Sequence, residues 1–149
     1  MNVLFDTNVI VDVFQKNQFC LHSFAAFDVC ITRGYRPYLA VSTMPDLAYL
    51  FQRRAGHEAP AAQEMVGSVL DLFSIMDMTQ SDCVQAHGSR MSDYEDALIA
   101  HAAKRTGMDL IITRNMEDFA DSPVPCMTPQ AFVEAYRPAG VSYTELSLS

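Results

Sequence analysis

The chain has 149 residues, half of them hydrophobic, and 18 acidic against 10 basic residues give a formal net charge of −8. This length suits one domain with a buried core, and no apolar run approaches the roughly 20 residues that cross a bilayer. The acidic excess disfavours a passive nucleic-acid-binding module, because affinity for phosphate comes largely from Lys and Arg. An enzyme that reaches phosphate through bound cations stays compatible with this charge.

Strand-like and helical segments alternate along the chain. Apolar runs predict five strands, over residues 2–5, 38–41, 72–76, 110–113 and 124–127. Helical spacing predicts helices over residues 9–14, 19–33, 45–54, 59–70, 81–90, 92–106 and 128–136. The alternation predicts a single α/β domain with a central parallel sheet of about five strands flanked by helices. We place this domain at residues 1–137 and expect the tail, residues 138–149, to be mobile because it has no helical pattern.

The helix that starts near Ser92 has the clearest end signals. Ser92 and Glu95 have capping-box spacing, in which each side chain binds the backbone N–H of the other residue. Gly107 stands where a left-handed cap would end the helix. This assignment predicts that Asp93 and Asp96 share one helix face and that Glu95 points elsewhere.

The four cysteines, Cys20, Cys30, Cys83 and Cys126, have no CxxC spacing and no paired histidine pattern. Such residues are typical of small buried apolar positions in a reducing cytosol. We therefore expect a cytoplasmic protein, without a signal peptide and without a zinc site built from these cysteines.

Three separated acidic groups stand at the ends of predicted elements. Asp6 follows the first strand, Asp93 and Asp96 stand on the helix near Ser92, and Asp118 follows the fourth strand. In open α/β sheets, sites form in the crevice beyond the carboxyl ends of the strands. Carboxylates about 4 Å apart repel by roughly 4 kcal/mol at an effective dielectric near 20, and a hard divalent cation such as Mg²⁺ or Mn²⁺ reverses that sign. The pattern predicts one metal pocket, in which a water could be activated toward a phosphodiester.

Each residue also has a plainer reading. Asp6 could form a turn after a strand, and Asp93 could simply favour the positive end of a helix. Three further acids, Asp12, Glu117 and Asp121, are read as solvated surface residues. Three arginines are candidate phosphate contacts or ordinary surface charges: Arg53, Arg54 and Arg114. Only the joint arrangement of the acids favours a site.

Four motifs carry a family resemblance over roughly residues 2 to 136. The segments 6–8 (DTN), 93–98 (DYEDAL), 112–119 (ITRNMEDF) and 125–132 (PCMTPQAF) resemble those of PIN-domain ribonucleases, in the branch related to VapC toxins. The resemblance implies a metal-dependent endoribonuclease, often the toxin of a toxin–antitoxin pair. It implies an RNA substrate, an antitoxin partner and a homodimer. Mg²⁺ or Mn²⁺ would be held by Asp6, Asp96, Asn115 and Asp118, with Asp93 assisting catalysis.

The chain departs from the family pattern at two positions. The family usually has a Glu six residues past a Ser on the helix after the second strand, and counting from Ser42 reaches Ala48. Asp46 is near but about 200° away around a helix, which makes it a doubtful substitute. The usual acid directly after Thr-Arg is Asn115 here. Neutral ligands weaken metal affinity, so a degenerate or specialised enzyme stays open.

Two other functions compete with RNA cleavage. A haloacid-dehalogenase-type phosphohydrolase also begins with an Asp after its first strand, but it needs a second Asp where this chain has Asn8, and no phosphate-binding Lys can be placed. A non-catalytic module that receives a basic partner segment in its acidic pocket is favoured by the missing Glu and the negative charge.

Overall fold

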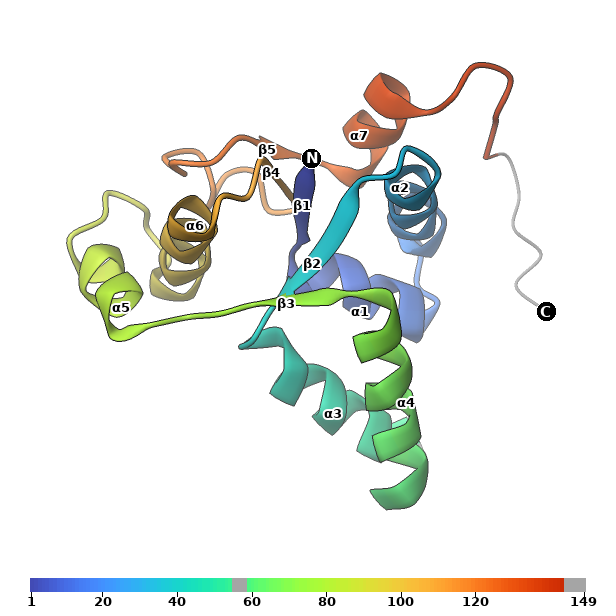
Figure 1. Ribbon diagram of the computed structural model, residues 1–149, viewed down its shortest axis with the longest axis horizontal. Helices are drawn as coiled ribbons and strands as arrows, with labels where there is room; N and C mark the ends of the chain where they lie inside the picture. The colour runs from blue at the N-terminus through green and yellow to red at the C-terminus, as the bar shows by residue number, and fades with distance from the viewer. Residues whose placement is uncertain (55–58, 144–149) are drawn as a thin grey trace.

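Five parallel strands form one sheet at the centre of the computed structural model, which describes residues 1–54 and 59–143 (Figure 1). Their order across the sheet is β3-β2-β1-β4-β5. The strands are β1 (Asn2–Phe5), β2 (Arg36–Ala40), β3 (Ser74–Met76), β4 (Leu110–Ile112) and β5 (Cys126–Met127). The predicted α/β fold with a five-stranded parallel sheet is confirmed. The chain leaves β1 toward β2 on one side and returns as β4 on the other, so β1 and β4 flank a topological switch point.

Helices cover both faces of the sheet. In the described part of the chain they are α1 (Thr7–Gln15), α2 (Cys20–Thr32), α3 (Thr43–Arg54), α4 (Ala59–Leu72), α5 (Gln80–His87), α6 (Tyr94–Thr106) and α7 (Pro129–Tyr136). Figure 1 shows α5 and α6 on one side of the strands, with α2 and α7 on the other. None of these helices is long and apolar enough to cross a membrane.

Alternate side chains along each strand pack into two separate hydrophobic cores. Val3 and Phe5 belong to the core under α1, α2, α3, α4 and α7, whereas Leu4 belongs to the core under α5 and α6. This division follows from the strand geometry, because successive side chains point to opposite faces. Phe5 is fully buried and makes edge contacts with Phe27 and Phe73, at centroid separations of 6.2 and 5.8 Å. Burial on both sides fixes β1 rigidly in the centre of the sheet.

The element ends differ by a few residues from the predicted ones. The third strand begins at Ser74 and not at residue 72, because Leu72 is the last residue of α4. A continuous apolar run cannot show where a helix ends and a strand begins. Cys20 and Cys30 are buried as expected, but Cys83 is exposed on α5, where it faces solvent and not a core.

The tail after α7 is described as far as Tyr143. The Tyr143 hydroxyl donates a hydrogen bond of 2.5 Å to Oδ2 of Asp28 on α2. Burial, followed by this contact with Asp28, raises the pKa of Tyr143 to about 12. The domain boundary at residue 137 and the mobility of the tail stay predictions, and residues 144–149 lie outside the described part.

Two glycines provide a matched test of backbone conformation. A Cβ on Gly67 in α4 or on Gly107 after α6 would meet no atom within 4 Å, but only Gly107 has a positive φ, of 77°. We expect Gly67→Ala to raise the free energy of unfolding by about 0.5–1 kcal/mol, because Ala is the better helix former. Gly107→Ala should lower it by about 1 kcal/mol, because the left-handed conformation is strained for Ala. Urea denaturation measures both changes, and equal signs would contradict this account.

Candidate active site

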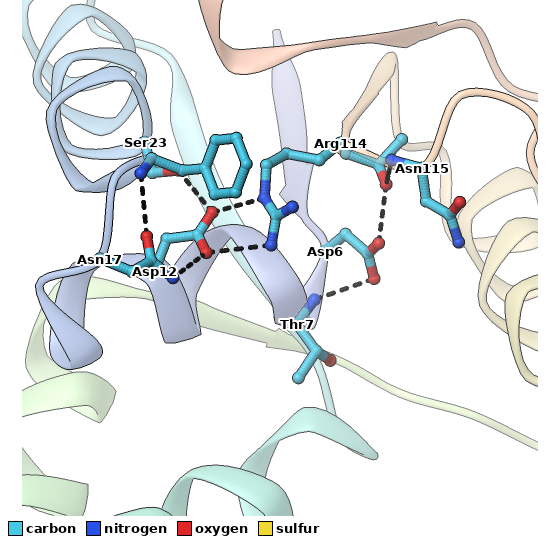
Figure 2. Close-up of polar contacts among 9 residues, drawn as sticks. Asp6, Thr7, Asp12, Asn17, Ser23, Arg114 and Asn115 are labelled. Atoms are coloured by element: carbon cyan, nitrogen blue, oxygen red, sulfur yellow. Dashed lines mark hydrogen bonds and ion pairs between the residues drawn. The ribbon is translucent and has the colours of Figure 1, made fainter.

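Asp6 is held at the switch point between β1 and β4. Its backbone N–H donates to the Ile112 carbonyl at 2.9 Å, which continues the pairing of the two strands. The Thr7 N–H donates to Oδ1 at 2.8 Å, so that Asp6 caps α1, and the Thr113 hydroxyl donates to Oδ2 at 2.8 Å (Figure 2). Only 6% of Asp6 is exposed. Each carboxylate oxygen therefore has one donor, and the group has one fixed orientation.

A crevice of about 390 Å³ opens above Asp6. Its acidic and amide lining comes from three parts of the chain that are distant in sequence: Asp6, Asn8, Asp12, Gln15 and Asn17, then Asp93, Glu95 and Asp96, then Asn115. Arg114 also lines this crevice. The Asn8 Oδ1 atom is buried and has no hydrogen-bond partner in the described structure. The structure thus places Asp6, Asp93, Asp96 and Asn115 around one opening, and their catalytic and metal-binding roles stay predictions.

The start of α6 differs from the predicted capping box. Asp93 is the N-cap, and its Oδ1 accepts the Asp96 N–H at 3.0 Å. The Ser92–Glu95 box is therefore wrong: Asp is as good an N-cap as Ser, and here it takes the position one residue later. Glu95 is released from capping and lines the crevice, which contradicts the expectation that it points elsewhere. Sequence analysis missed Glu95 because two adjacent residues could each begin the helix.

Asp118 is linked to the crevice by hydrogen bonds through Asn115. The Asn115 side-chain N–H donates to Oδ2 of Asp118 at 2.6 Å and lies 3.5 Å from Oδ2 of Asp96. Asp118 is half-buried and is not part of the crevice lining, unlike the other three predicted catalytic acids. The Asn115 amide thus joins Asp118 to Asp96, and the predicted catalytic and metal-binding role of Asp118 stays a prediction.

The carboxylates lack enough nearby positive charge. The pKa of Asp96 is raised to about 7, and burial is the largest cause. Repulsion from Asp6, Asp93 and Asp118 adds to this shift. Burial also raises the pKa of Asp6, although the hydrogen bonds from Thr113 and Thr7 oppose the shift. Protonation or a bound cation would each relieve this repulsion.

The Asp96 shift predicts a pH-dependent stability. The folded protein holds the Asp96 proton up to about pH 7, while the unfolded chain releases it near the ordinary value of 3.8. The unfolded state therefore binds fewer protons between these values, and the stability that the raised pKa contributes is lost as pH rises through about 7. We expect the melting temperature of the metal-free protein to fall from about pH 5 to about pH 8, and Asp96→Asn to reduce this fall. Thermal denaturation measures it, and Asp71→Asn, an exposed change on α4, should keep the wild-type slope.

Asp12 is not the solvated surface residue that the sequence suggested. It is 1% exposed, and its carboxylate accepts hydrogen bonds from Arg114 Nε at 2.6 Å and Arg114 Nη2 at 3.0 Å (Figure 2). Asn17 and Ser23 also donate to it, at 2.8 and 3.2 Å. No local pattern could reveal this role, since Asp12 and Arg114 are 102 positions apart. Arg114 is consequently committed to an ion pair and is not simply a free surface charge.

The first turn of α3 lies beside the crevice. The hydroxyls of Thr7 and Thr43 share a hydrogen bond of 2.7 Å, which joins the starts of α1 and α3. Burial raises the pKa of Glu95, and the negative charge of exposed Asp46 is the next largest cause. Ala48, where the family usually has Glu, is half-buried and carries no ligand atom. Asp46, two residues before Ala48 in α3, is therefore near enough to Glu95 for its charge to raise the pKa of Glu95.

The donor set suits a hard divalent cation by its chemistry. Its members are carboxylate and amide oxygens, which Mg²⁺ and Mn²⁺ prefer, and the raised pKa of Asp96 reflects charge that a cation would compensate. Among residues 1–54 and 59–143, however, no three His, Cys, Asp or Glu side chains lie close enough together to hold a metal ion as they stand. A cation held by three of these side chains would require them to move closer together than they lie in this structure.

Fold and crevice together define a class, the parallel α/β domains with an acidic site at the switch point of the sheet. Comparison with protein families gives a more specific result: the PIN domain family model matches residues 2–117. The chain belongs to the PIN domain family, and the predicted resemblance is confirmed. The haloacid-dehalogenase alternative is set aside by this match. No curated protein matches the chain.

Solved structures with the same fold include toxins from bacterial toxin–antitoxin complexes. VapBC2 from Rickettsia felis, bound to a DNA fragment from its promoter, matches with a TM-score of 0.64 and 14% identity, over 86% of this chain and 98% of the other. A toxin–antitoxin complex from Klebsiella pneumoniae matches with a TM-score of 0.62 and 22% identity, over 86% and 98%. FitAcB from Neisseria gonorrhoeae matches with a TM-score of 0.64 and 23% identity, over 85% of this chain and 97% of the other. At these identities the likeness establishes the fold.

Proposed function

We propose that the protein is a metal-dependent endoribonuclease that hydrolyses RNA phosphodiester bonds. The observation that carries this proposal is the shared crevice of Asp6 and Asp96, acids 90 positions apart in a PIN-family chain. Their mutual repulsion leaves the site short of positive charge. A divalent cation would supply the positive charge that the site lacks, and it would also attract the anionic phosphodiester.

Several residues of the chain would have distinct roles in this reaction. Asp6 would be a fixed ligand, because Thr7 and Thr113 hold both of its oxygens. Asp96 would exchange its proton for the cation, and Asn115 would keep Asp96 and Asp118 in register. Bound Mg²⁺ or Mn²⁺ would neutralise charge on the phosphorus oxygens and lower the pKa of an attacking water.

Two measurements test this function. Purified protein with structured RNA should cleave it in Mg²⁺ or Mn²⁺, and EDTA should abolish cleavage. Calorimetric titration with Mg²⁺ at about pH 7, in two buffers of different ionisation enthalpy, should show proton release, because Asp96 must deprotonate when a cation binds. Cleavage that persists in EDTA would remove the proposed role of the acids.

We further propose that the protein is the toxin of a toxin–antitoxin pair, which is supported by the neighbours that were solved as such complexes. A basic antitoxin segment that places Arg or Lys among the crevice carboxylates would block the site, and a homodimer would present two crevices. The alternative of a non-catalytic PIN module is favoured by Ala48 and Asn115. Tight binding of a basic partner without metal uptake or cleavage would select that alternative.

A further inference from the structure

A second pocket, of about 300 Å³, lies next to the acidic crevice between the starts of α2 and α7. We call it the α2–α7 pocket and define it by Phe19, His22, Arg114 and Gln130, which line it. Arg114 lines both openings, so its side chain forms a wall that the two sites share. A ligand that occupies the crevice could extend into this pocket across Arg114.

The α2–α7 pocket differs from the crevice in charge and in character. Arg114 gives its Nε and Nη2 atoms to Asp12, while Nη1 forms no hydrogen bond with the residues that the structure describes. The Arg114 guanidinium carbon lies 4.1 Å from the centroid of the Phe19 ring, and 32% of the side chain is exposed. His22 and Gln130 are exposed at the rim and can donate further hydrogen bonds. The pocket therefore combines donors with an aromatic surface.

These features match one nucleotide. A phosphate group needs donors and positive charge, and a base needs an aromatic or apolar face on which to stack. The volume is at the lower end of small-ligand pockets, which suits a single nucleotide. The need for such a subsite is clear from the charge of the chain, −8, because the carboxylate crevice alone would repel the RNA backbone.

We propose that the α2–α7 pocket binds the nucleotide adjacent to the scissile bond of the RNA substrate. Arg114 Nη1 and His22 contact its phosphate, Gln130 contacts the polar edge of its base, and the base packs against the part of Phe19 that the Arg114 guanidinium does not cover. This inference rests on the proposed function for the identity of the substrate. The binding surface itself can be tested without any cleavage.

The first test uses adenosine 5′-monophosphate as the probe, with the full-length protein in EDTA. Amide NMR shifts on titration should concentrate on residues 19–23, 114 and 128–130. In the double variant His22→Ala, Gln130→Ala the affinity should fall about tenfold, because the His22 hydrogen bond to the charged phosphate and the Gln130 contact with the polar edge are both lost. Adenosine without phosphate should bind the wild type more weakly by a similar factor.

The matched control is His87→Ala, Gln63→Ala, which removes the same two residue types from exposed positions on α5 and α4. Its affinity for adenosine 5′-monophosphate should equal that of the wild type. Shifts elsewhere on the molecule, or equal affinities for the two double variants, would overturn the pocket assignment.

Cleavage kinetics separate this inference from the proposed function. With a short RNA in Mn²⁺, the double variant His22→Ala, Gln130→Ala should raise KM about tenfold and change kcat less than about twofold. If the wild type cleaves RNA and the variant has an unchanged KM, the subsite is refuted and the proposed nuclease function stands. Nucleotide binding without wild-type cleavage refutes the nuclease and supports only the pocket.

Discussion

Asp96→Asn is expected to slow RNA cleavage by about 100-fold or more at saturating Mn²⁺. Asp96 lines the crevice with Asp6 and carries the pKa raised to about 7, so its charge is the one that a cation would most stabilise. The amide removes that charge but keeps the size of the side chain. Single-turnover cleavage of a labelled RNA measures the rate, and calorimetry measures the accompanying loss of Mg²⁺ affinity.

Asp71→Asn is the control for this substitution. It makes the same chemical change at an exposed position on α4, and its cleavage rate should match the wild type. Asp96→Asn should also unfold at an equal or higher temperature than the wild type near pH 8, because it relieves repulsion within the crevice. A slow variant that is also unfolded would point to structural damage, and a rate within about threefold of the wild type would exclude Asp96 from the chemistry.

Arg114→Met is expected to lower the free energy of unfolding by about 3 kcal/mol. Arg114 makes two hydrogen bonds to Asp12, which is 1% exposed and would be left as a buried carboxylate without its cation. Met keeps much of the apolar contact of the side chain, so the loss reports mainly the missing charge. Urea denaturation gives the value directly.

A double-mutant cycle identifies the cause of that loss. Adding Asp12→Asn to Arg114→Met removes the stranded charge, so the double variant should recover part of the stability. Arg90→Met, at an exposed position after α5, should change stability by less than about 0.5 kcal/mol. Strictly additive losses from Asp12→Asn and Arg114→Met would show that the two side chains are not coupled.

The sheet and the crevice could be predicted because both follow from the order of strands and helices along the chain. Strands alternating with helices require a parallel sheet, and Asp6 directly follows the first strand, so its place at the sheet edge could be deduced. The grouping of Asp6 with Asp96 followed from the same rule and from the family motifs. Catalytic roles within the group are a separate matter, and the experiments above decide them.

The errors arose where a residue's partner is distant or where two neighbours compete. From the sequence, the Asp12 position in α1 is typical of a solvent-facing helix site. In the fold, Arg114, which follows β4, lies beside Asp12 and pairs with it. Ser92 and Asp93 are equally good caps, and only the packing of α6 decides between them. That one-residue choice also decides whether Glu95 binds the backbone or enters the crevice.

The central position of β1 has a consequence for synthesis on the ribosome. β1 is made before β4, one of its two neighbours in the sheet, which spans Leu110–Ile112, and the Thr113 hydroxyl that orients Asp6 follows β4. A nascent chain in which these residues have not yet emerged from the ribosome cannot assemble the pocket. Asp6 can thus take its fixed orientation only after residue 113 has been translated, so the pocket forms after the synthesis of β4 and not with that of β1.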